Sequence, residues 1–398
     1  MLKIAIVTPY GAEERLDHFA EFILAKGLDK LGYNVQFYTY KIKGEPLYRK
    51  DSVYQGIKVF RCRQRSGLSP GLFFSILKFK PRVVIFFHPK SFLSFTAYLA
   101  AKSVRAKIIS EIVGILHDPY IVDDTDDPIN NFKQNINLLT TWKKLFKAIL
   151  AGRPLEQWNN FVRHMPISKA DIIVAINEDE QKYIKRFYDR DSVLIYWCIK
   201  KNNGDKIKPS EDKYGPIPGE YLLFIAQIKK RKGWDTVIEA LAVLKNQGIK
   251  KNLVFVCPAT NVEEAKNYIE KLGIEDQVFF FCQVTNEEKN WLYDHAQYVL
   301  APSRYEGFGL PVFEAFVAGK PLFGTDTPVY LEFLRHKENA MVSKTGSAQE
   351  LAQNIKMLDN DPALANCLVL EGYKTAARFS GKVMIDKFVK LIEAAGSL

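Results

Sequence analysis

The segment 300–319 carries residues whose types and spacing suit the binding of a phosphorylated ligand. An apolar strand ends in a Gly-Phe-Gly loop, and Pro311 then opens an apolar helix. Glycine lets a backbone approach a ligand closely, and the N–H groups and dipole of a helix N-terminus favour an anion. Glu306 lies in the loop, and Glu314 lies about one turn into the helix, within reach of a ribose beside that phosphate. The alternative is an ordinary turn with two solvent-facing glutamates.

The setting of these two glutamates resembles glycosyltransferase family 4. They form an E-x7-E pair within Pro-Ser-Arg-Tyr-Glu-Gly-Phe-Gly-Leu-Pro-Val-Phe-Glu-Ala-Phe-Val-Ala-Gly-Lys-Pro, and the similarity is dense over residues 221–335 and thinner but colinear elsewhere. The family comprises retaining, nucleotide-sugar-dependent enzymes of GT-B architecture, with two facing Rossmann-like domains. The resemblance implies that Glu306 is catalytic, near the transferred sugar, and that Glu314 binds the nucleotide ribose. It also assigns donor binding to Phe308, Gly309 and Leu310.

A basic turn at residues 224–233, Phe-Ile-Ala-Gln-Ile-Lys-Lys-Arg-Lys-Gly, sits where the family usually shows Gly-Arg-x4-Lys-Gly. The resemblance implies that Lys232 binds the donor and assists catalysis, because a cation stabilises the charge that develops on the departing diphosphate. The position of the usual arginine is occupied by Gln227 here, and a neutral amide does not replace the charged, two-pronged guanidinium group of arginine. Either Arg231 or Lys230 compensates at the donor, or the donor differs. The alternative is a solvated basic turn.

Three further positions depend on the same resemblance. Residues 280–288 resemble the loop that contacts the nucleotide base, and we expect backbone contacts near Val284. Gly11 is the donor-phosphate candidate in the first βα loop, where the family commonly has two glycines and an ordinary turn is the alternative. His117 is the candidate for the catalytic histidine that faces the sugar, although Gly114 fills that slot in another alignment. The His117–Asp118 pair is either an active-site donor or a loop salt bridge.

The elements that position these loops alternate along the chain. Apolar, β-branched runs alternate with helical segments from residue 3 to residue 196 and again from residue 221 to residue 324, which predicts βαβ units and an α/β fold with doubly wound parallel sheets. Ligands of such sheets bind outside the carboxyl ends of the strands. We predict a Rossmann-like acceptor domain at 1–200, a linker at 201–218 and a Rossmann-like donor domain at 219–378. A C-terminal helix follows at 379–398, and packing back on the N-terminal domain is one option for it.

The charge of the chain is concentrated in its first half. Residues 1–200 hold 31 Lys and Arg against 20 Asp and Glu, whereas residues 201–398 hold 25 of each, so the whole net charge of +11 lies before residue 201. This asymmetry suggests an anionic partner, either a membrane surface or an acidic acceptor, and the alternative is a solvated basic face. We expect no nucleic-acid partner.

Several classes of protein are disfavoured by composition. The five cysteines are odd in number and none forms a C-x-x-C pair, so neither a disulfide framework nor a zinc site is indicated. No apolar run reaches the roughly 18–20 residues that span a bilayer, and the first apolar run is too short for a signal peptide. We expect a cytoplasmic protein, with peripheral membrane contact as an option.

Two other motifs in the first half have competing interpretations. The Asp-x-Asp at 124–126 resembles a metal site of another glycosyltransferase architecture, but it follows no strand directly, and we interpret it as a turn and predict no metal. The pattern of residues 138–150 predicts a basic amphipathic helix with Leu138, Trp142 and Phe146 among its apolar residues. Packing on the sheet is its common fate, and insertion into a membrane surface is the alternative.

Together these features predict a retaining glycosyltransferase. It would move a sugar from a nucleoside-diphosphate sugar to a glycan, a lipid-linked acceptor or a small molecule, with no cofactor and no metal. Two alternatives remain from other classes. One is a nucleotide-sugar epimerase of the same architecture, and the other is a non-catalytic nucleotide-sugar-binding protein, which Gln227 and the single glycine at Gly11 would suit.

Overall fold

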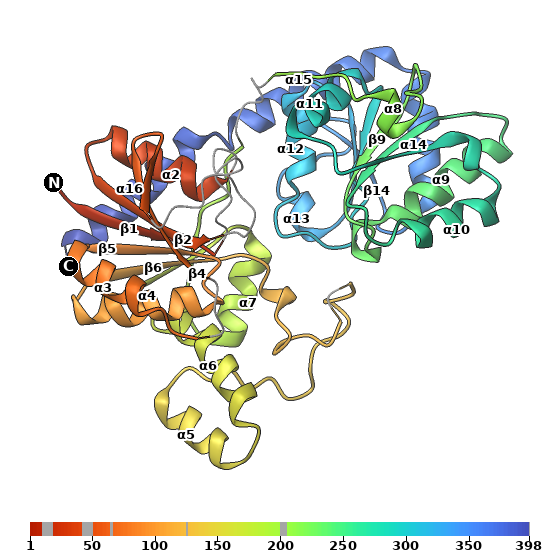
Figure 1. Ribbon diagram of the computed structural model, residues 1–398. Helices are drawn as coiled ribbons and strands as arrows, with labels where there is room; N and C mark the ends of the chain where they lie inside the picture. Colours follow the sequence, from red (N-terminus) through yellow and green to blue (C-terminus); the bar gives the residue numbers. More distant parts are fainter. Residues whose placement is uncertain (10–18, 42–50, 64–66, 125, 200–204, 398) are drawn as a thin grey trace. The chain divides into compact units, whose positions relative to one another are not determined.

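The computed structural model describes residues 1–9, 19–41, 51–63, 67–124, 126–199 and 205–397 (Figure 1). The chain divides into two compact units. Unit 1 consists of Met1–Asp123, Phe132–Cys198 and Ser380–Leu398, and unit 2 consists of Asp124–Asn131 and Ile199–Phe379. Each unit is an α/β domain built on its own, largely parallel sheet, so the predicted fold class is confirmed.

The sheet of unit 1 has eight strands. They are β1 (Lys3–Val7), β2 (Asn34–Lys41), β3 (Asp51–Tyr54), β4 (Ile57–Arg63), β5 (Val83–Phe87), β6 (Lys107–Ile112), β7 (Ile172–Ala175) and β8 (Val193–Leu194). Their spatial order is β3-β4-β2-β1-β5-β6-β7-β8, and the edge strand β3 runs antiparallel to β4. Strand β5 is buried along its whole length, as expected for a parallel strand covered on both faces.

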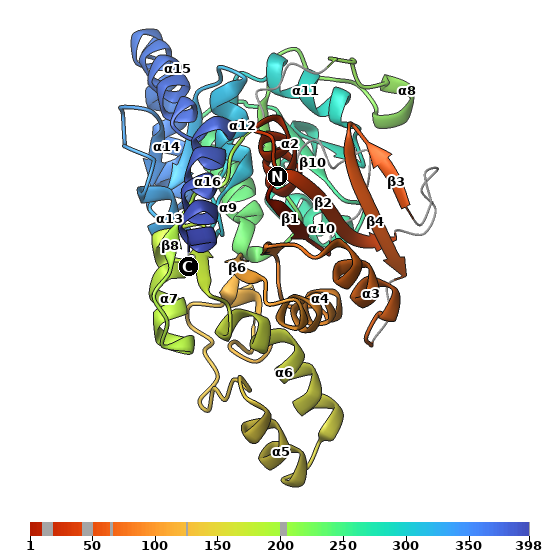
Figure 2. The same ribbon diagram turned by 90° about the vertical axis from the view of Figure 1, so that its left-hand side faces the viewer.

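Helices cover both faces of this sheet. They are α2 (Ala20–Lys30), α3 (Pro70–Phe79), α4 (Phe92–Ser103), η1 (Ile115–His117), α5 (Trp142–Leu150), α6 (Pro154–Ser168), α7 (Glu178–Tyr188) and α16 (Gly381–Ser397). Figures 1 and 2 show α2 and α16 on one face and α3 and α4 on the other. The C-terminal helix α16 belongs to this unit: the ring of Phe388 lies 5.9 Å from that of Phe87, and a Cβ at Gly27 of α2 would overlap Ile385.

The sheet of unit 2 has six parallel strands. They are β9 (Leu222–Ile225), β10 (Leu253–Cys257), β11 (Val278–Cys282), β12 (Tyr298–Leu300), β13 (Leu322–Thr325) and β14 (Met341–Ser343). Their order is β11-β10-β9-β12-β13-β14, which is the doubly wound order of a dinucleotide-binding domain, with a switch point between β9 and β12. The crevice for a ligand is therefore expected where the loops after β9 and β12 leave the sheet.

The helices of unit 2 complete this domain. They are α8 (Glu211–Tyr214), η2 (Lys230–Lys232), α9 (Trp234–Asn246), α10 (Val262–Leu272), η3 (Glu275–Gln277), α11 (Asn286–His295), α12 (Leu310–Val317), α13 (Pro328–Leu331), α14 (Ala348–Asp359) and α15 (Pro362–Ala377). Short α8 lies in the stretch expected as a linker and packs on this unit. Tyr214 stacks on Phe281 with ring centroids 5.0 Å apart and donates a hydrogen bond to Glu288 at 3.0 Å.

Some elements differ from the sequence-based expectation. Strands β3 and β14 were not predicted, because one is a four-residue edge strand and the other is a three-residue strand with no room for periodicity. The amphipathic helix predicted over 138–150 begins at Trp142 instead, since the Thr141 hydroxyl caps it by accepting a hydrogen bond from the Lys144 amide. Leu138 and Leu139 are buried before the helix starts.

Candidate functional site

Two charged side chains meet at the switch point of unit 2. Lys232 ends η2 after β9, and Glu306 lies in the loop after β12, the neighbouring strand. The Lys232 Nζ is 2.5 Å from Glu306 Oε1, and the Ser303 hydroxyl donates to the same oxygen at 2.7 Å. Burial lowers the pKa of Lys232, and the Glu306 carboxylate opposes that shift. Two of the three residues that the sequence analysis assigned to catalysis thus form an ion pair at the predicted edge of the sheet, and the third, His117, belongs to unit 1.

The two loops that carry this pair are fastened to each other. Gly233 has a φ of 71°, and a Cβ there would overlap the carbonyl oxygen of Pro302, so only glycine allows this approach. The Arg304 guanidinium holds both carboxylate oxygens of Asp235, at 2.6 and 3.0 Å. The Arg304 amide also donates to the Arg231 carbonyl at 2.7 Å. Sequence reasoning missed Arg304 and Asp235, because both look like ordinary solvent-facing charges.

Glu314 is held in place by the neighbouring helix α11. Its Oε1 is 2.7 Å from Lys289 Nζ, and its Oε2 accepts a hydrogen bond from the Tyr293 hydroxyl at 2.8 Å. Burial raises the pKa of Tyr293 well above its ordinary value, and the Glu314 carboxylate adds to that shift. The carboxylate therefore lies beside a cation and is oriented by a phenol. The spacing of Lys289 and Tyr293 places both on one face of α11, but nothing in the sequence relates that face to Glu314.

The glycine loop divides its remaining residues between the interior and the surface. The Phe308 side chain is buried in an aromatic cluster and stacks on Phe313 at 4.7 Å, so any donor contact there would come from its backbone. Gly309 has a φ of 84° and precedes α12, and a Cβ there would overlap the Tyr330 ring. Leu310, the first residue of the helix, is exposed.

The other donor candidates of unit 2 lie at the same edge. Gln227 is exposed and follows β9, and its carbonyl accepts a hydrogen bond from the Lys229 amide at 2.9 Å. Arg231 contributes its carbonyl to the contact with the loop that follows β12. Val284 follows β11 and is half-buried, directly before the N-cap Thr285 of α11. All three residues lie near the ends of β9 and β11, and no hydrogen bond among the described residues joins one of their side chains to another.

Of the two site candidates in unit 1, the structure describes only His117. Gly11 lies outside the described residues. His117 ends η1 and is half-buried, while its neighbour Asp118 is fully buried among cations. The Asp118 carboxylate lies 3.2 Å from Lys90 Nζ and 3.2 Å from Arg163 Nη2. Burial alone would raise the pKa of Asp118, but Lys90 and the other basic groups lower it. The carboxylate thus serves a buried ionic cluster.

Three buried glutamates lie in the same unit. Glu111 of β6 accepts a hydrogen bond from Trp197 Nε1 at 2.8 Å, and Glu21 of α2 accepts one from the Thr8 hydroxyl at 3.0 Å. Burial raises the pKa of Glu21 and of Glu180 to about 7, and that of Glu111 well above its ordinary value. Sequence reasoning missed them, because a lone glutamate in a helix is usually solvent-facing. The position of Glu111 inside an apolar strand was the available signal.

The aspartates at 124, 126 and 127 take part in local hydrogen bonds. Asp124 accepts a hydrogen bond from the Asp126 amide at 2.8 Å, and Asp127 accepts one from the Asn130 side chain at 3.0 Å. In the part of the chain that the structure describes, no three His, Cys, Asp or Glu side chains gather as metal ligands. Among the same residues, no helix has the length and apolar character needed to cross a bilayer.

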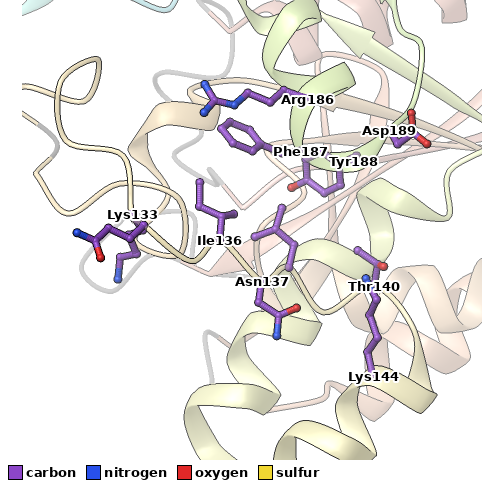
Figure 3. Close-up of a pocket in the computed structure, with 11 residues that line it drawn as sticks. Lys133, Ile136, Asn137, Thr140, Lys144, Arg186, Phe187, Tyr188 and Asp189 are labelled. Carbon is purple, nitrogen blue, oxygen red and sulfur yellow. The ribbon is translucent and has the colours of Figure 1, made fainter.

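Unit 1 also contains a hollow of about 490 Å³ (Figure 3). The segment before α5 and the last turn of α7 form its walls, and its charged lining residues are Lys133, Lys144, Arg186 and Asp189. Figure 3 shows Arg186 beside Phe187, and its guanidinium lies 5.2 Å from the centre of that ring. Helix α7 starts where β7 ends, so its last turn lies toward the opposite edge of the sheet. The hollow contains no residue that the sequence assigned to the site.

Comparison with known proteins relates unit 2 to enzymes of sugar transfer. Residues 209–375 match the family model described as Glycosyl transferases group 1. The chain is 27% identical to a putative glycosyltransferase, EpsD, of Bacillus subtilis, over 61% of this chain and 66% of that protein. It is 30% identical to the O-antigen biosynthesis glycosyltransferase WclY of Escherichia coli, over 41% of this chain and 45% of that protein. These alignments span two thirds or less of each relative's length.

Solved structures resemble the whole chain. A glycosyltransferase from Rickettsia africae superposes with a TM-score of 0.70 at 18% identity, covering 99% of this chain and 98% of its own. HepE from Anabaena, solved in complex with UDP and glucose, superposes with a TM-score of 0.66 at 17% identity, covering 99% of this chain and all of its own. At these identities the likeness shows the fold, and it confirms the GT-B architecture expected from the sequence.

Proposed function

We propose that this protein is a retaining glycosyltransferase that uses a nucleoside-diphosphate sugar. The observation that carries the proposal is the Lys232–Glu306 ion pair at the switch point of unit 2. A cation and a carboxylate side by side, at the place where doubly wound sheets bind nucleotides, suit a reaction that separates a positive sugar from a negative phosphate. The match of residues 209–375 to the group 1 glycosyl transferases supports the same assignment.

In this proposal Lys232 acts on the leaving group. When the bond between the sugar and the diphosphate breaks, negative charge grows on the phosphate oxygen, and the ammonium stabilises it. Lys232 is largely buried, so its attraction to that charge is screened less than it would be in water. The Glu306 carboxylate lies beside Lys232 and stabilises the positive charge that develops on the sugar ring.

Donor binding involves the start of α12 in this proposal. The backbone N–H groups around Gly309 and Leu310 receive the diphosphate, because the first N–H groups of a helix lack partners within it. Glu314 accepts hydrogen bonds from the ribose hydroxyls, and Lys289 and Tyr293 hold its carboxylate in one orientation. The structural neighbour HepE was solved with UDP-glucose, which supports this class of donor.

The acceptor is assigned to unit 1. The acceptor hydroxyl attacks the same face of the sugar from which the diphosphate leaves, and the departing phosphate takes the hydroxyl proton. This course needs no separate general base and gives a product of retained configuration. Similar proteins include an O-antigen biosynthesis glycosyltransferase and a serotype-specific mannosyltransferase of Escherichia coli. They support a glycan or a lipid-linked saccharide as the acceptor.

The test has two steps. Thermal shift against UDP-, GDP-, ADP- and dTDP-sugars identifies the donor by the largest rise in melting temperature. The selected donor is then incubated with candidate acceptors, and NMR determines the anomeric configuration of the product. A transferred sugar with inverted configuration would exclude the retaining mechanism. Interconversion of the free nucleotide sugar without an acceptor would identify an epimerase instead.

The non-catalytic alternative is favoured by one observation. Gln227 is neutral and exposed where the resemblance expects an arginine. A binder without activity would show the thermal shift but neither transfer nor hydrolysis of the donor. Gln227→Arg separates the possibilities further: it should tighten binding of the matching nucleoside diphosphate in either case, but it should raise turnover only in an enzyme.

A further inference from the structure

The hairpin of α5 and α6 ends in a tip that carries both apolar and basic side chains. Helix α5 packs on α6 through buried Leu145, and the ring of Trp142 lies 4.6 Å from that of Phe161. The chain then turns at Gly152 and Arg153, which have φ angles of 119° and 52°, and enters α6. Figures 1 and 2 show α5 at the outer end of unit 1, away from its sheet.

Large apolar side chains of the tip face solvent. Phe146 is 64% exposed, Leu150 is 89% exposed, and Leu155 at the start of α6 is 79% exposed. At roughly 100° per residue, Trp142, Phe146 and Leu150 fall within about 80° on one side of α5. Trp142 packs on Phe161 and Leu145 is buried, but Phe146 and Leu150 lie farther round the helix, so packing of the hairpin does not account for these two side chains.

Basic side chains flank the stripe. On the same helical wheel, Lys143 and Lys147 follow Leu150 by about 20° and 60°. Arg153 lies in the turn between the helices, and Glu156 pairs with it at 3.3 Å. An apolar stripe bordered by lysines, with an aromatic residue at its start, is the pattern of a helix that lies in a membrane interface.

We propose that this tip docks on a bilayer of anionic phospholipids. Phe146, Leu150 and Leu155 enter the boundary between headgroups and acyl chains, while Lys143 and Lys147 reach the lipid phosphates. Protein interfaces are depleted in lysine, whereas anionic lipid surfaces attract it, so the composition of the tip favours a bilayer over a protein partner. The proposal does not depend on the transferase assignment.

The burial of glutamates strengthens the charge argument. The excess of basic residues lies in residues 1–200, where 31 Lys and Arg face 20 Asp and Glu. Glu21, Glu111 and Glu180 belong to those 20, and they are buried instead of lying at the surface. Among the described residues of this range, Arg61 is the basic residue buried to the same degree, so burial removes more acidic than basic residues from the surface of residues 1–200 and adds long-range attraction to an anionic bilayer.

Vesicle flotation of the full chain tests the proposal. The vesicles contain phosphatidylcholine alone or mixed with phosphatidylglycerol, at low and high salt. We expect flotation with the anionic vesicles and its loss at high salt, because screening shortens the reach of charges to about 8 Å at physiological ionic strength. Double substitution Phe146→Ser with Leu150→Ser should lower partitioning at least tenfold. Lys143→Gln with Lys147→Gln should lower it by about fivefold per lysine.

Matched controls separate docking from general effects. Phe74→Ser removes an aromatic side chain of similar exposure from α3, and Lys266→Gln with Lys356→Gln removes two exposed lysines from unit 2. Both controls should float like the wild type. Brominated lipid should quench the tryptophan fluorescence of the vesicle-bound protein, and Trp142→Phe should remove most of this quenching. Each variant is checked by its melting temperature, and its thermal shift with the nucleotide reports separately on unit 2.

Several results would overturn the proposal. One is no flotation of the wild type with any vesicle, and another is equal flotation of the Phe146→Ser, Leu150→Ser variant and the wild type. Light scattering gives a third. If the protein dimerises and this double variant is a monomer, a second copy of the chain covers the tip in place of a bilayer.

Discussion

Charged groups are handled differently in the two units. In unit 2, Glu306 and Glu314 each lie beside a lysine, at 2.5 and 2.7 Å, at the edge of the sheet where the loops leave the strands. In unit 1, Glu21 and Glu111 are buried and accept hydrogen bonds from the neutral side chains of Thr8 and Trp197, and burial raises their pKa values. Pairing preserves charge for binding or catalysis, whereas burial without a cation removes it.

Because of this contrast, we expect substitutions of charged residues to have different effects in the two units. The pairs of unit 2 should control turnover and affinity, because their charges are available to a ligand. The buried acids of unit 1 should control the pH dependence of folding, because they exchange protons when the unit unfolds. The predictions below test that division.

The largest effect is expected at the ion pair of unit 2. Glu306→Gln and Lys232→Met should each lower kcat by roughly 100- to 1000-fold, because both groups act on charge that appears in the transition state. Lys229→Met is the matched control, since Lys229 is an exposed lysine of the same turn. Initial rates at saturating donor measure the effect. An equal loss in Lys229→Met would show that the turn contributes only general positive charge.

The second effect concerns the contact between the two loops. Gly233→Ala places a Cβ against the Pro302 carbonyl and should destabilise unit 2 by about 2 kcal/mol more than Gly248→Ala does. Gly248 has a similar φ of 76° but open space around it, so its substitution carries only the backbone cost of about 1–2 kcal/mol. Urea unfolding curves of the two variants give the comparison. Equal midpoints would mean that the loops separate easily.

The third effect is on donor affinity. Glu314→Ala should weaken binding of the matching nucleoside diphosphate by about 1.5–3 kcal/mol, or one to two decades, because a charge-assisted hydrogen bond is lost. Tyr293→Phe keeps the carboxylate and removes only its orienting partner, so it should cost about fivefold. Calorimetric titration measures both. Unchanged affinity in Glu314→Ala would contradict the ribose assignment.

The fourth effect belongs to unit 1 and depends on pH. Folded Glu180 holds its proton up to a pKa of about 7, whereas the unfolded residue releases it near 4.5. Unfolding therefore releases a proton between these values, so the contribution of Glu180 to stability falls as pH rises from 4.5 to 7 and is constant above 7. Glu180→Gln copies the protonated form and should be more stable than the wild type at pH 8, by on the order of 1–3 kcal/mol.

Chemical unfolding at several pH values measures this difference. It should shrink toward zero as the pH falls to 4.5. Glu178→Gln, on the exposed side of the same helical turn, is the control and should show no such dependence. A pH-independent gain in Glu180→Gln would mean that the carboxyl group is not protonated in the folded protein.

The smallest expected effect is that of a chelator. Transfer should continue at an unchanged rate in the presence of EDTA, because Lys232, the neighbouring basic residues and the start of α12 meet the charge of the donor. Rates with and without EDTA, and after addition of Mg²⁺ or Mn²⁺, provide the measurement. Inhibition by EDTA that either ion reverses would contradict this prediction and would favour a metal site at Asp124 and Asp126.

The sequence by itself determined the strands other than β3 and β14, the loops that follow them and the segments that carry the candidate site. Strands such as β5 and β10 can be recognised in the sequence as continuous apolar runs, because a parallel strand buried on both faces has apolar residues at every position. Lys232 and Glu306 were assigned to one site from the resemblance to glycosyltransferase family 4, and they form an ion pair. Each follows a strand of the sheet, and neighbouring parallel strands bring their carboxyl ends to one edge.

Only the tertiary structure decided which side chains are buried and what they contact. Phe308 belongs to an aromatic cluster with Phe313, and Glu314 is held by Lys289. Glu180 of α7 accepts a hydrogen bond from the Ile115 amide, 65 residues earlier in the chain. The protonation of such a group depends on its desolvation and on the donors around it, and both come from segments distant in sequence. The periodicity of a segment predicts which of its faces packs on the core, but it does not predict which other segment packs against that face.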